Sequence, residues 1–349
     1  MNIAIYFSLS AENLRSNFVV ETFFPLFERF PYQKLTLITD KQPDRDFNSS
    51  KIEVLFIKPS PKNILLKKLW IETRLTGLLK KSKADIFISA DNFCSLKTDL
   101  PQFILLPDPD KIKPVYVKKA QLLIVLSELN KKELIDKLKL PGDKIAVVNL
   151  SPNKSYKQID TEKKESIKKK YSEGKEYFLF NNNSWNEENI INLLKSFSHF
   201  KKRLQSSFKL IILDQLNFNF KKIIENYKYR DDVVVIRSNS IEEKAAISGA
   251  AYAVVFPFNI NEGIVAALNA TRSGVPIIAI KDSFIKEVAG DAPLYATNDI
   301  KDIGEKMMQL YKDESLRSEL IKKGIGYTRD LTEDRSATEL WQSITKAMN

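Results

Sequence analysis

The chain alternates between short runs of apolar, mostly β-branched residues and longer segments in which apolar residues recur with the period of a helix. Such alternation is typical of parallel sheets whose faces are covered by helices, and it excludes all-α and all-β folds. In the first half, the helical period predicts helices at 19–29, 65–80 and 131–138. The apolar runs there predict strands at 3–7, 35–38, 54–57, 86–89, 103–106, 122–126 and 145–148.

A second set of elements begins after an aperiodic stretch. Residues 151–161 are rich in Ser, Pro, Asn and Lys, which is typical of a linker. After it, a second doubly wound sheet is predicted, with three further helices from residue 300 to the C-terminus. Its strands are expected at 177–180, 209–213, 233–236, 252–256 and 276–279, and its helices at 187–204, 220–227, 241–248 and 265–273.

Length and composition agree with two α/β domains. A chain of 349 residues exceeds what one hydrophobic core usually serves. We therefore predict a first domain at 1–150, a linker at 151–161 and a second domain at 162–333. With 43% hydrophobic and 28% charged residues, the chain has the composition of a soluble globular protein.

Several classes of protein are disfavoured. No apolar run is long enough to span a bilayer, and the N-terminus lacks the features of a signal peptide, so the cytoplasm is the expected location. The net charge of +11 suits nucleic acid, an anionic membrane or a phosphorylated ligand. However, the lysines are interleaved with acids on predicted helices, and no aromatic-basic motif is present, so we expect no nucleic-acid partner. Cys94 and His199 are the only residues of their kinds, which argues against disulfides, histidine triads and metal sites.

Motifs in both halves resemble one family. The sequence Leu126-Ser127-Glu128, followed by a helix, a Pro-Gly turn and a strand, is similar to the end of the N-terminal domain in family 4, or group 1, glycosyltransferases. Residues 177–213 look like the first βαβ unit of the family's nucleotide-sugar domain. The resemblance implies the GT-B architecture, with two Rossmann-like doubly wound domains facing a cleft and a final helix, 334–349, crossing back to the first domain. Later motifs keep the family's order, namely Ser273-Gly274-Val275-Pro276, Glu287-Val288-Ala289-Gly290 and Leu340-Trp341.

The donor site is where this chain departs from the family. The family holds the sugar-nucleotide diphosphate with an Arg/Lys pair after the first strand of the second domain. In an alignment on Asn189, that pair becomes Glu187 and Glu188, while Asn182 and Ser184 lie in the same predicted loop. Two carboxylates at a helix start also suit its positive dipole end, which explains them without any ligand.

The family's second hallmark is a pair of glutamates eight positions apart, which contact the sugar and the ribose. Counting back from the Gly-Val-Pro motif, those positions are Asn261 and Asn269. In an alternative register, Glu262 is the first glutamate, followed by Gly263. The backbone of Gly263 and Ile264 would then approach the phosphate, although an amphipathic helix packed on its sheet explains this stretch equally.

Two basic residues and the acceptor side complete the candidate site. Arg237 and Lys244 are predicted at strand-to-helix junctions, where they could contact phosphate or simply be surface charge. The family commonly has His-Asp after the strand equivalent to 103–106, and here Pro107 precedes Asp108. The stretch 110–118 is short, so an acceptor-covering helix is expected to be missing. Contacts from the loop after the first strand are expected from three residues, Arg15, Ser16 and Asn17.

Two functional hypotheses remain. The resemblance implies a retaining glycosyltransferase that moves a hexose from a nucleotide sugar to a glycan or lipid-linked acceptor, with Asp108, Asn261 and Glu262 at the catalytic positions and no further cofactor. The substituted motifs favour an inactive relative that binds a sugar, a nucleotide or a partner glycosyltransferase. In either case, peripheral contact with the inner face of the membrane remains open.

Overall fold

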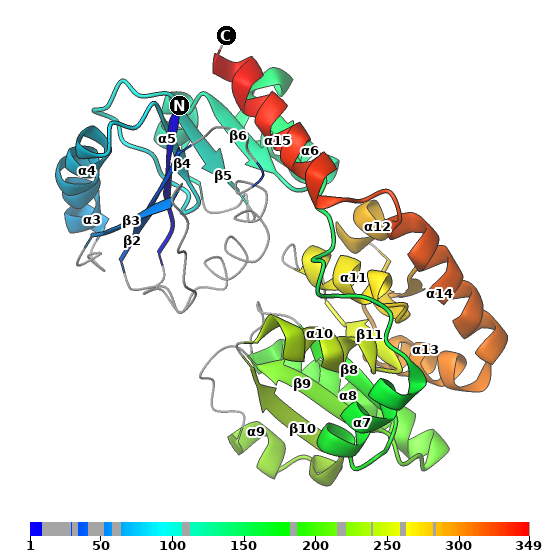
Figure 1. Cartoon of the computed structure of the whole chain (residues 1–349). Coiled ribbons are helices and arrows are strands. Elements are labelled where there is room, and N and C mark those ends of the chain that lie inside the picture. Colours follow the sequence, from blue (N-terminus) through cyan, green and yellow to red (C-terminus); the bar gives the residue numbers. More distant parts are fainter. Residues whose placement is uncertain are drawn as a thin grey trace. The chain divides into compact units, whose positions relative to one another are not determined.

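The chain forms two compact units, which are described separately. The computed structural model describes residues 1–8, 29, 34–40, 52–57, 64–106, 112–181, 187–214, 221–238, 240–258, 263–281 and 284–348. Unit 1 comprises Met1–Leu150 together with Glu333–Asn349, and unit 2 comprises Ser151–Thr332. Both are α/β units built on a parallel sheet, which confirms the predicted fold class (Figure 1).

Unit 1 contains a seven-stranded sheet in the order β3-β2-β1-β4-β5-β6-β7, and every described pairing is parallel. This is the doubly wound order, in which the chain builds outward from β1 on one side and then from β4 on the other. Each strand lies within two residues of its predicted position. The strands are β1 (Asn2–Tyr6), β2 (Lys34–Thr39), β3 (Ile52–Phe56), β4 (Ile86–Ser89), β5 (Gln102–Leu105), β6 (Leu122–Val125) and β7 (Ile145–Val147).

The helices of unit 1 differ from expectation in two places. A π-helical turn, Ile71–Leu75, separates α3 (Ile64–Trp70) from α4 (Thr76–Lys81) within the predicted single helix. A short helix, α5 (Pro114–Lys119), occupies the stretch where no helix was expected, with proline at its start, where no backbone N–H is needed. The other described helices are α6 (Glu128–Leu138) and α15 (Glu333–Met348).

The last helix, α15, belongs to unit 1 although it follows unit 2 in the chain. Ser336 donates a hydrogen bond from Oγ to the carbonyl of Asn149 (2.5 Å). Arg29 pairs with Glu333 (2.6 Å) and with Asp334 (2.6 Å). These contacts connect α15 both to the end of the first strand set and to Arg29 near the N-terminus. The predicted helix at 19–29 otherwise lies outside the described residues.

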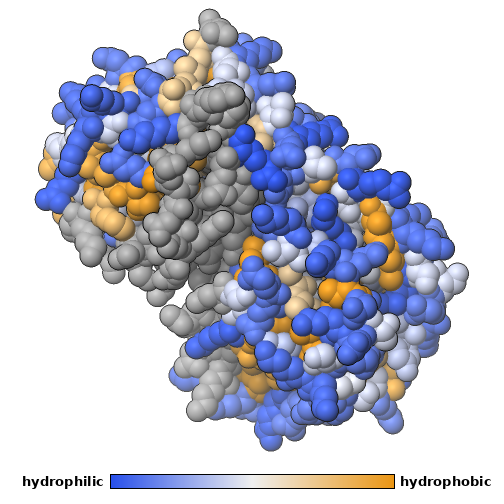
Figure 2. Space-filling model, viewed as in Figure 1, coloured by the Kyte–Doolittle hydropathy of each residue, from blue (hydrophilic) through white to orange (hydrophobic). Residues whose placement is uncertain are grey.

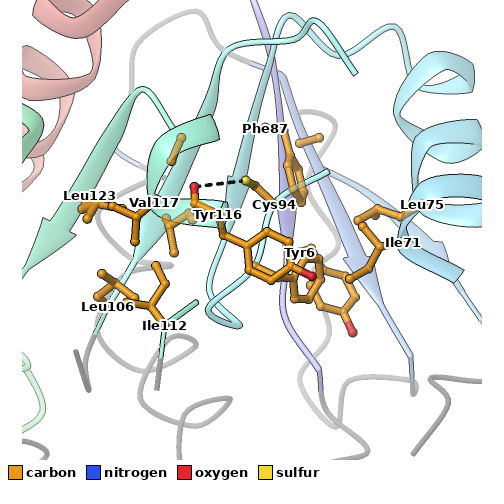
Figure 3. Close-up of a cluster of buried hydrophobic side chains, with 14 of the residues drawn as sticks. Tyr6, Ile71, Leu75, Phe87, Cys94, Leu106, Ile112, Tyr116, Val117 and Leu123 are labelled. Carbon is orange, nitrogen blue, oxygen red and sulfur yellow. Dashed lines mark hydrogen bonds between the residues drawn. The ribbon is translucent and has the colours of Figure 1, made fainter. Parts of the chain in front are cut away.

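One core cluster of unit 1 lies between a face of its sheet and the helices that cover that face. Figure 3 shows the cluster, in which Tyr6, Phe87 and Cys94 are fully buried beside Tyr116 of α5. The Cys94 thiol donates to the carbonyl oxygen of Tyr116 (3.5 Å). Burial raises the pKa of this thiol to about 12, so Cys94 is an inert core residue.

Unit 2 repeats the same topology with six strands, in the order β10-β9-β8-β11-β12-β13. The described strands are β8 (Tyr177–Asn181), β9 (Lys209–Asp214), β10 (Val233–Arg237), β11 (Ala253–Phe256), β12 (Ile277–Ile280) and β13 (Leu294–Ala296). The helices are α7 (Thr161–Ser172), α8 (Glu187–Leu204), α9 (Lys221–Glu225), α10 (Ile241–Gly249), α11 (Gly263–Arg272), α12 (Phe284–Ala289), α13 (Ile300–Lys312) and α14 (Glu314–Thr328).

Helices cover both faces of the unit 2 sheet. One core contains side chains of α8, α13 and α14, and includes Phe178 and Phe180 of β8. The other contains side chains of α7, α10, α11 and α12, with Tyr177 and Leu179 of the same strand. Because alternate residues of β8 point to opposite faces, its near-continuous apolar sequence is that of a strand buried on both sides.

The described surface in the view of Figure 2 is mainly hydrophilic, and hydrophobic residues are exposed in small groups. On α3 of unit 1, Leu66 and Leu69 are 55% and 60% exposed. Within the described ranges, none of the helices combines the length and apolar character that crossing a bilayer would require.

Candidate functional site

The candidate site of unit 2 lies where the winding of its sheet reverses. From β8 the chain proceeds to β9 and β10 on one side, and then returns to β11 on the other side of β8. In doubly wound sheets, ligands bind at the carboxyl ends of the strands beside this reversal. Two helices begin beyond these strands, α8 at Glu187 and α11 at Gly263.

The start of α11 has the character of an anion site. Gly263 is buried, and Ile264 is 0% exposed because its side chain packs into the core. Neither side chain has a polar group, so backbone N–H groups are the hydrogen-bond donors of this turn. The first turn of the described helix contains no acidic residue, although Glu262 directly precedes it in the sequence. Unpaired N–H groups at such an end can bind phosphate oxygens.

The start of α8 has the opposite charge. Glu187 and Glu188 are both exposed in the first turn, and neither forms an ion pair with any residue that the structure describes. Their negative charges interact favourably with the positive end of the helix dipole, and this is a sufficient local reason for their position. A diphosphate bound near this turn would nevertheless meet two carboxylates that no described cation pairs with.

The two basic candidates are placed differently. Arg237 ends β10 and is exposed, but β9 lies between β10 and β8. With neighbouring strands about 4.8 Å apart, the Cα of Arg237 lies roughly 10 Å from the β8 axis. Lys244 is only 3% exposed within α10, so its side chain is covered and does not line a ligand surface.

Asn269 of α11 is bound to the linker segment. It is 6% exposed, and its Oδ1 accepts a hydrogen bond from the backbone N–H of Asn153 (2.8 Å). The side chain of Asn153 in turn accepts from the N–H of Ser155 (2.9 Å). The carbonyl oxygen expected to contact a ribose is therefore used to hold residues 153–155 on unit 2.

A polar cluster that the sequence did not indicate lies beside the end of β10. Glu243 accepts hydrogen bonds from the hydroxyls of Ser238 (2.5 Å) and Tyr171, and Lys170 lies 3.4 Å from the same carboxylate. These bonds, chiefly that from Ser238, hold the pKa of Glu243 below its usual range. The local signal was the Ser240-x-x-Glu243 spacing of a helix start, but Tyr171 is distant in sequence.

The remaining candidates cannot be placed. Eight of them lie outside the described residues, namely Arg15, Ser16, Asn17, Asp108, Asn182, Ser184, Asn261 and Glu262. Among the residues that are described, no three His, Cys, Asp or Glu side chains gather where they could hold a metal ion. Of the sequence-predicted donor residues, the structure therefore locates Glu187, Glu188, Gly263 and Ile264 at the reversal point, Arg237 at the edge strand, and Lys244 and Asn269 inside the unit.

Comparison with known proteins identifies what this arrangement is similar to. Residues 161–326 match the family model "Glycosyl transferases group 1", which confirms the resemblance found in the sequence. Over 187 residues, the chain is 27% identical to the O-antigen chain mannosyltransferase RfbU of Salmonella typhimurium, covering 52% of this chain and 48% of that protein. Over 226 residues it is 22% identical to the O-antigen chain mannosyltransferase B of Escherichia coli, covering 63% and 59%. The chain thus spans about half the length of the curated relatives it matches.

Solved structures extend the likeness to both units. A glycosyltransferase from Rickettsia africae superposes with a TM-score of 0.79 and 12% identity, covering 100% of this chain and 98% of that one. WaaG, a glycosyltransferase involved in lipopolysaccharide biosynthesis, gives 0.78 and 11%, covering 99% and 100%. Anabaena HepE, solved with UDP and glucose, gives 0.73 and 10%, covering 99% and 100%. At such identities the likeness establishes the fold, which is GT-B.

Proposed function

We propose, on the premise that residues 161–326 form a group 1 glycosyltransferase domain within a GT-B fold, that this protein transfers a hexose from a nucleotide sugar to a glycan or lipid-linked acceptor. The observation that carries the proposal is the start of α11, where Gly263 and Ile264 begin a helix at the reversal point of the sheet. A diphosphate is the ligand that this geometry suits.

The nature of donor and acceptor follows from the relatives. Both curated relatives are described as O-antigen chain mannosyltransferases, which favours mannose as the hexose and a growing cell-surface glycan as the acceptor. The Anabaena HepE structures hold UDP, glucose or UDP-glucose, which supports a nucleotide sugar as the donor. Retention of the anomeric configuration is carried over from the family resemblance.

Glycosyl transfer requires the protein to position the donor and the acceptor and to stabilise the charge that develops on the leaving diphosphate. Transfer leaves a nucleoside diphosphate carrying new negative charge, and preorganised N–H donors at a helix start stabilise it without reorganisation. Holding donor and acceptor together supplies the remaining advantage by proximity. In this proposal the N-terminal turn of α11 stabilises the leaving diphosphate.

A second function, binding without turnover, is favoured by one observation. Glu187 and Glu188 are exposed, and within the described part of the chain they form no ion pair, where the family presents an Arg/Lys pair. Like charge close to a diphosphate lowers its affinity. A protein that binds a sugar or a partner glycosyltransferase would tolerate these carboxylates, whereas an efficient transferase needs another cation.

Turnover separates the two functions. The full chain should be incubated with UDP- and GDP-hexoses, GDP-mannose included, and with lipid-linked and soluble glycan acceptors, while release of the nucleoside diphosphate is measured. Acceptor-dependent release supports the transferase. Saturable calorimetric binding of a nucleotide sugar without any release would instead support the binding protein.

The charge argument has its own test. The double variant Glu187→Arg/Glu188→Lys should bind UDP or GDP roughly tenfold or more tightly, because two repulsive charges become attractive. A control of equal net charge is Glu314→Arg/Glu319→Lys on α14, in which Glu314 is the acidic residue of the first turn and Glu319 lies one turn later. Equal affinity gains in both variants would mean that the site near α8 does not bind the diphosphate.

A further inference from the structure

The amino edge of the unit 2 sheet lies opposite the edge that holds the candidate site. β8 and β11 are neighbouring parallel strands, so the residues directly before them, Glu176 and Tyr252, meet at this amino edge. The N–H of Tyr252 donates to the carbonyl of Tyr177 (2.9 Å). Two helices contribute cations here, because Lys168 of α7 pairs with Glu176 and Arg317 of α14 lies against the Tyr252 ring. A group of charges therefore forms away from the candidate site.

Arg317 is held in place at this edge. Its guanidinium carbon lies 4.4 Å from the centroid of the Tyr252 ring, and Nη1 lies 3.0 Å from a carboxylate oxygen of Glu314. The Tyr252 hydroxyl donates to the carbonyl of Leu310 in α13 (2.9 Å), so the ring is fixed as well. The positive charge of Arg317 therefore has a defined position.

Lys168 is a second cation at this edge, and its charge is balanced. The residue is 8% exposed, and its ammonium lies 2.5 Å from Glu176 and 3.0 Å from Glu165. Elsewhere in the unit, Lys201 is 6% exposed and pairs with Asp232 (2.8 Å). Covered ammonium groups need such partners, because burial penalises the charged form.

Lys164 differs from these lysines. It is partly buried and lies one turn before Lys168 on the same side of α7. Among the described residues, its ammonium has neither an ion-pair partner nor a hydrogen-bond acceptor. Burial, followed by the charges of Arg317 and Lys168, lowers the pKa of Lys164, while Glu176 acts in the opposite direction. A lysine that is desolvated beside other cations offers more of the uncharged, nucleophilic amine than an ordinary surface lysine.

We propose that Lys164 is a modification site whose amine is acylated by acyl phosphates. Its side chain is only partly buried, so a small reagent reaches the amine, and surroundings that disfavour an ammonium favour an anionic reagent. The uncharged amine attacks the carbonyl carbon, a C–N bond forms, and the bond from that carbon to the phosphate oxygen breaks. Inorganic phosphate leaves with the electron pair, and the amine proton passes to water. The reaction needs no nucleotide sugar and is independent of the proposed function.

The test is acetylation of the folded full chain by acetyl phosphate at about pH 8, where ordinary lysines are almost entirely charged. Acetylation of each lysine is quantified over time by peptide mass spectrometry. The matched controls are Lys163 and Lys169, which are exposed on the same helix. We expect Lys164 to react roughly fivefold faster than either, the effect of one like charge close to the amine. In urea, where the tertiary structure is lost, the three lysines should react at equal rates.

Arg317→Met removes the neighbouring charge and keeps an unbranched side chain over the Tyr252 ring. It should slow acetylation of Lys164 about threefold or more and leave the two control lysines unchanged. Arg335→Met in unit 1 is the control variant, because it breaks a comparable pair with Glu339 (3.0 Å) and changes the net charge equally. Equal rates at Lys164 and the control lysines of the folded wild type, or an unchanged Lys164 rate in Arg317→Met, would overturn the proposal.

The pH profile distinguishes an activated amine from one that is merely accessible. The ratio of the Lys164 rate to the Lys163 rate should fall as the pH approaches the ordinary lysine pKa of about 10.4, because both amines are then uncharged. A ratio that stays constant through this range would mean that accessibility alone favours Lys164, which contradicts the proposal. If Arg317→Met does not fold, this profile of the wild type decides.

Discussion

Gly304 lies in α13 where this helix packs against α8, and the contact leaves no room for a methyl group. A Cβ at this position would lie 2.8 Å from the carbonyl oxygen of Ser196 and 2.9 Å from the Cβ of His199. Both atoms belong to or adjoin the backbone of α8, so neither can rotate away. Relief requires the two helices to separate by several tenths of an ångström across a well-packed face.

The size of the effect follows from two opposing contributions. Overpacking a closely packed contact costs about 1–3 kcal/mol. Alanine in place of glycine within a helix recovers about 0.5–1 kcal/mol. We therefore expect Gly304→Ala to lower the free energy of unfolding of unit 2 by about 1–2 kcal/mol, and its melting temperature by a few degrees.

The matched control is Gly326→Ala in α14, where nothing lies within 4 Å of the added Cβ. This variant should gain about 0.5–1 kcal/mol through helix propensity alone. Urea and thermal unfolding followed by circular dichroism measure both variants. If Gly304→Ala proves as stable as Gly326→Ala, the close packing of α8 on α13 is wrong.

Two further predictions concern unit 2. Gly274 has φ of 70°, and a Cβ there would lie 2.9 Å from Nε2 of Gln158. We therefore expect Gly274→Ala to lower the free energy of unfolding in urea by about 1–2 kcal/mol. An unchanged midpoint would argue against the left-handed turn. Hydrogen bonds from Ser238 and Tyr171 hold the pKa of Glu243 below its usual range. The charged carboxylate therefore stabilises the folded protein fully at pH values above its unfolded-state pKa of about 4.3. This stabilisation is lost as the pH falls through the lower folded-state pKa. When the free energy of unfolding is measured from pH 6 downward, Glu243→Gln should make its decrease at acidic pH less steep. An unaltered decrease would exclude Glu243 as its source.

Hydrophobic periodicity in the sequence determined the elements. The limits of α8, Glu187–Leu204, coincide with the predicted helix, and the strands on both sides of the linker lie within two residues of their expected positions. These segments are long or strongly apolar, so local propensity and burial favour the same structure. Two short elements, α5 (Pro114–Lys119) and β13 (Leu294–Ala296), were not predicted because they contain too few periodic positions.

Some features of the candidate site could likewise be predicted from the sequence, and others could not. Glu187 begins α8 as predicted, because the acidic first turn and the helical period are local features of the sequence, whereas α11 begins at Gly263, two residues before its predicted start. The partner of Asn269 is instead Asn153, far away in the chain, and the burial of Lys244 depends on the elements packed around α10. No local pattern could indicate either outcome.

The buried side-chain amides of Asn92 and Asn130 show this limit most clearly. The sequence determines that residues 92 and 130 are asparagines near the ends of strands, and the strand pattern brings those ends to one edge. Whether an asparagine finds a hydrogen-bond partner depends on which atoms of distant segments come within about 3 Å of it. Only the tertiary structure decided that Gln102 pairs with the backbone of Ser95, while the side-chain amides of Asn92 and Asn130 have no partner in the described part of the chain. Burial removes water as the default partner and leaves the choice to packing.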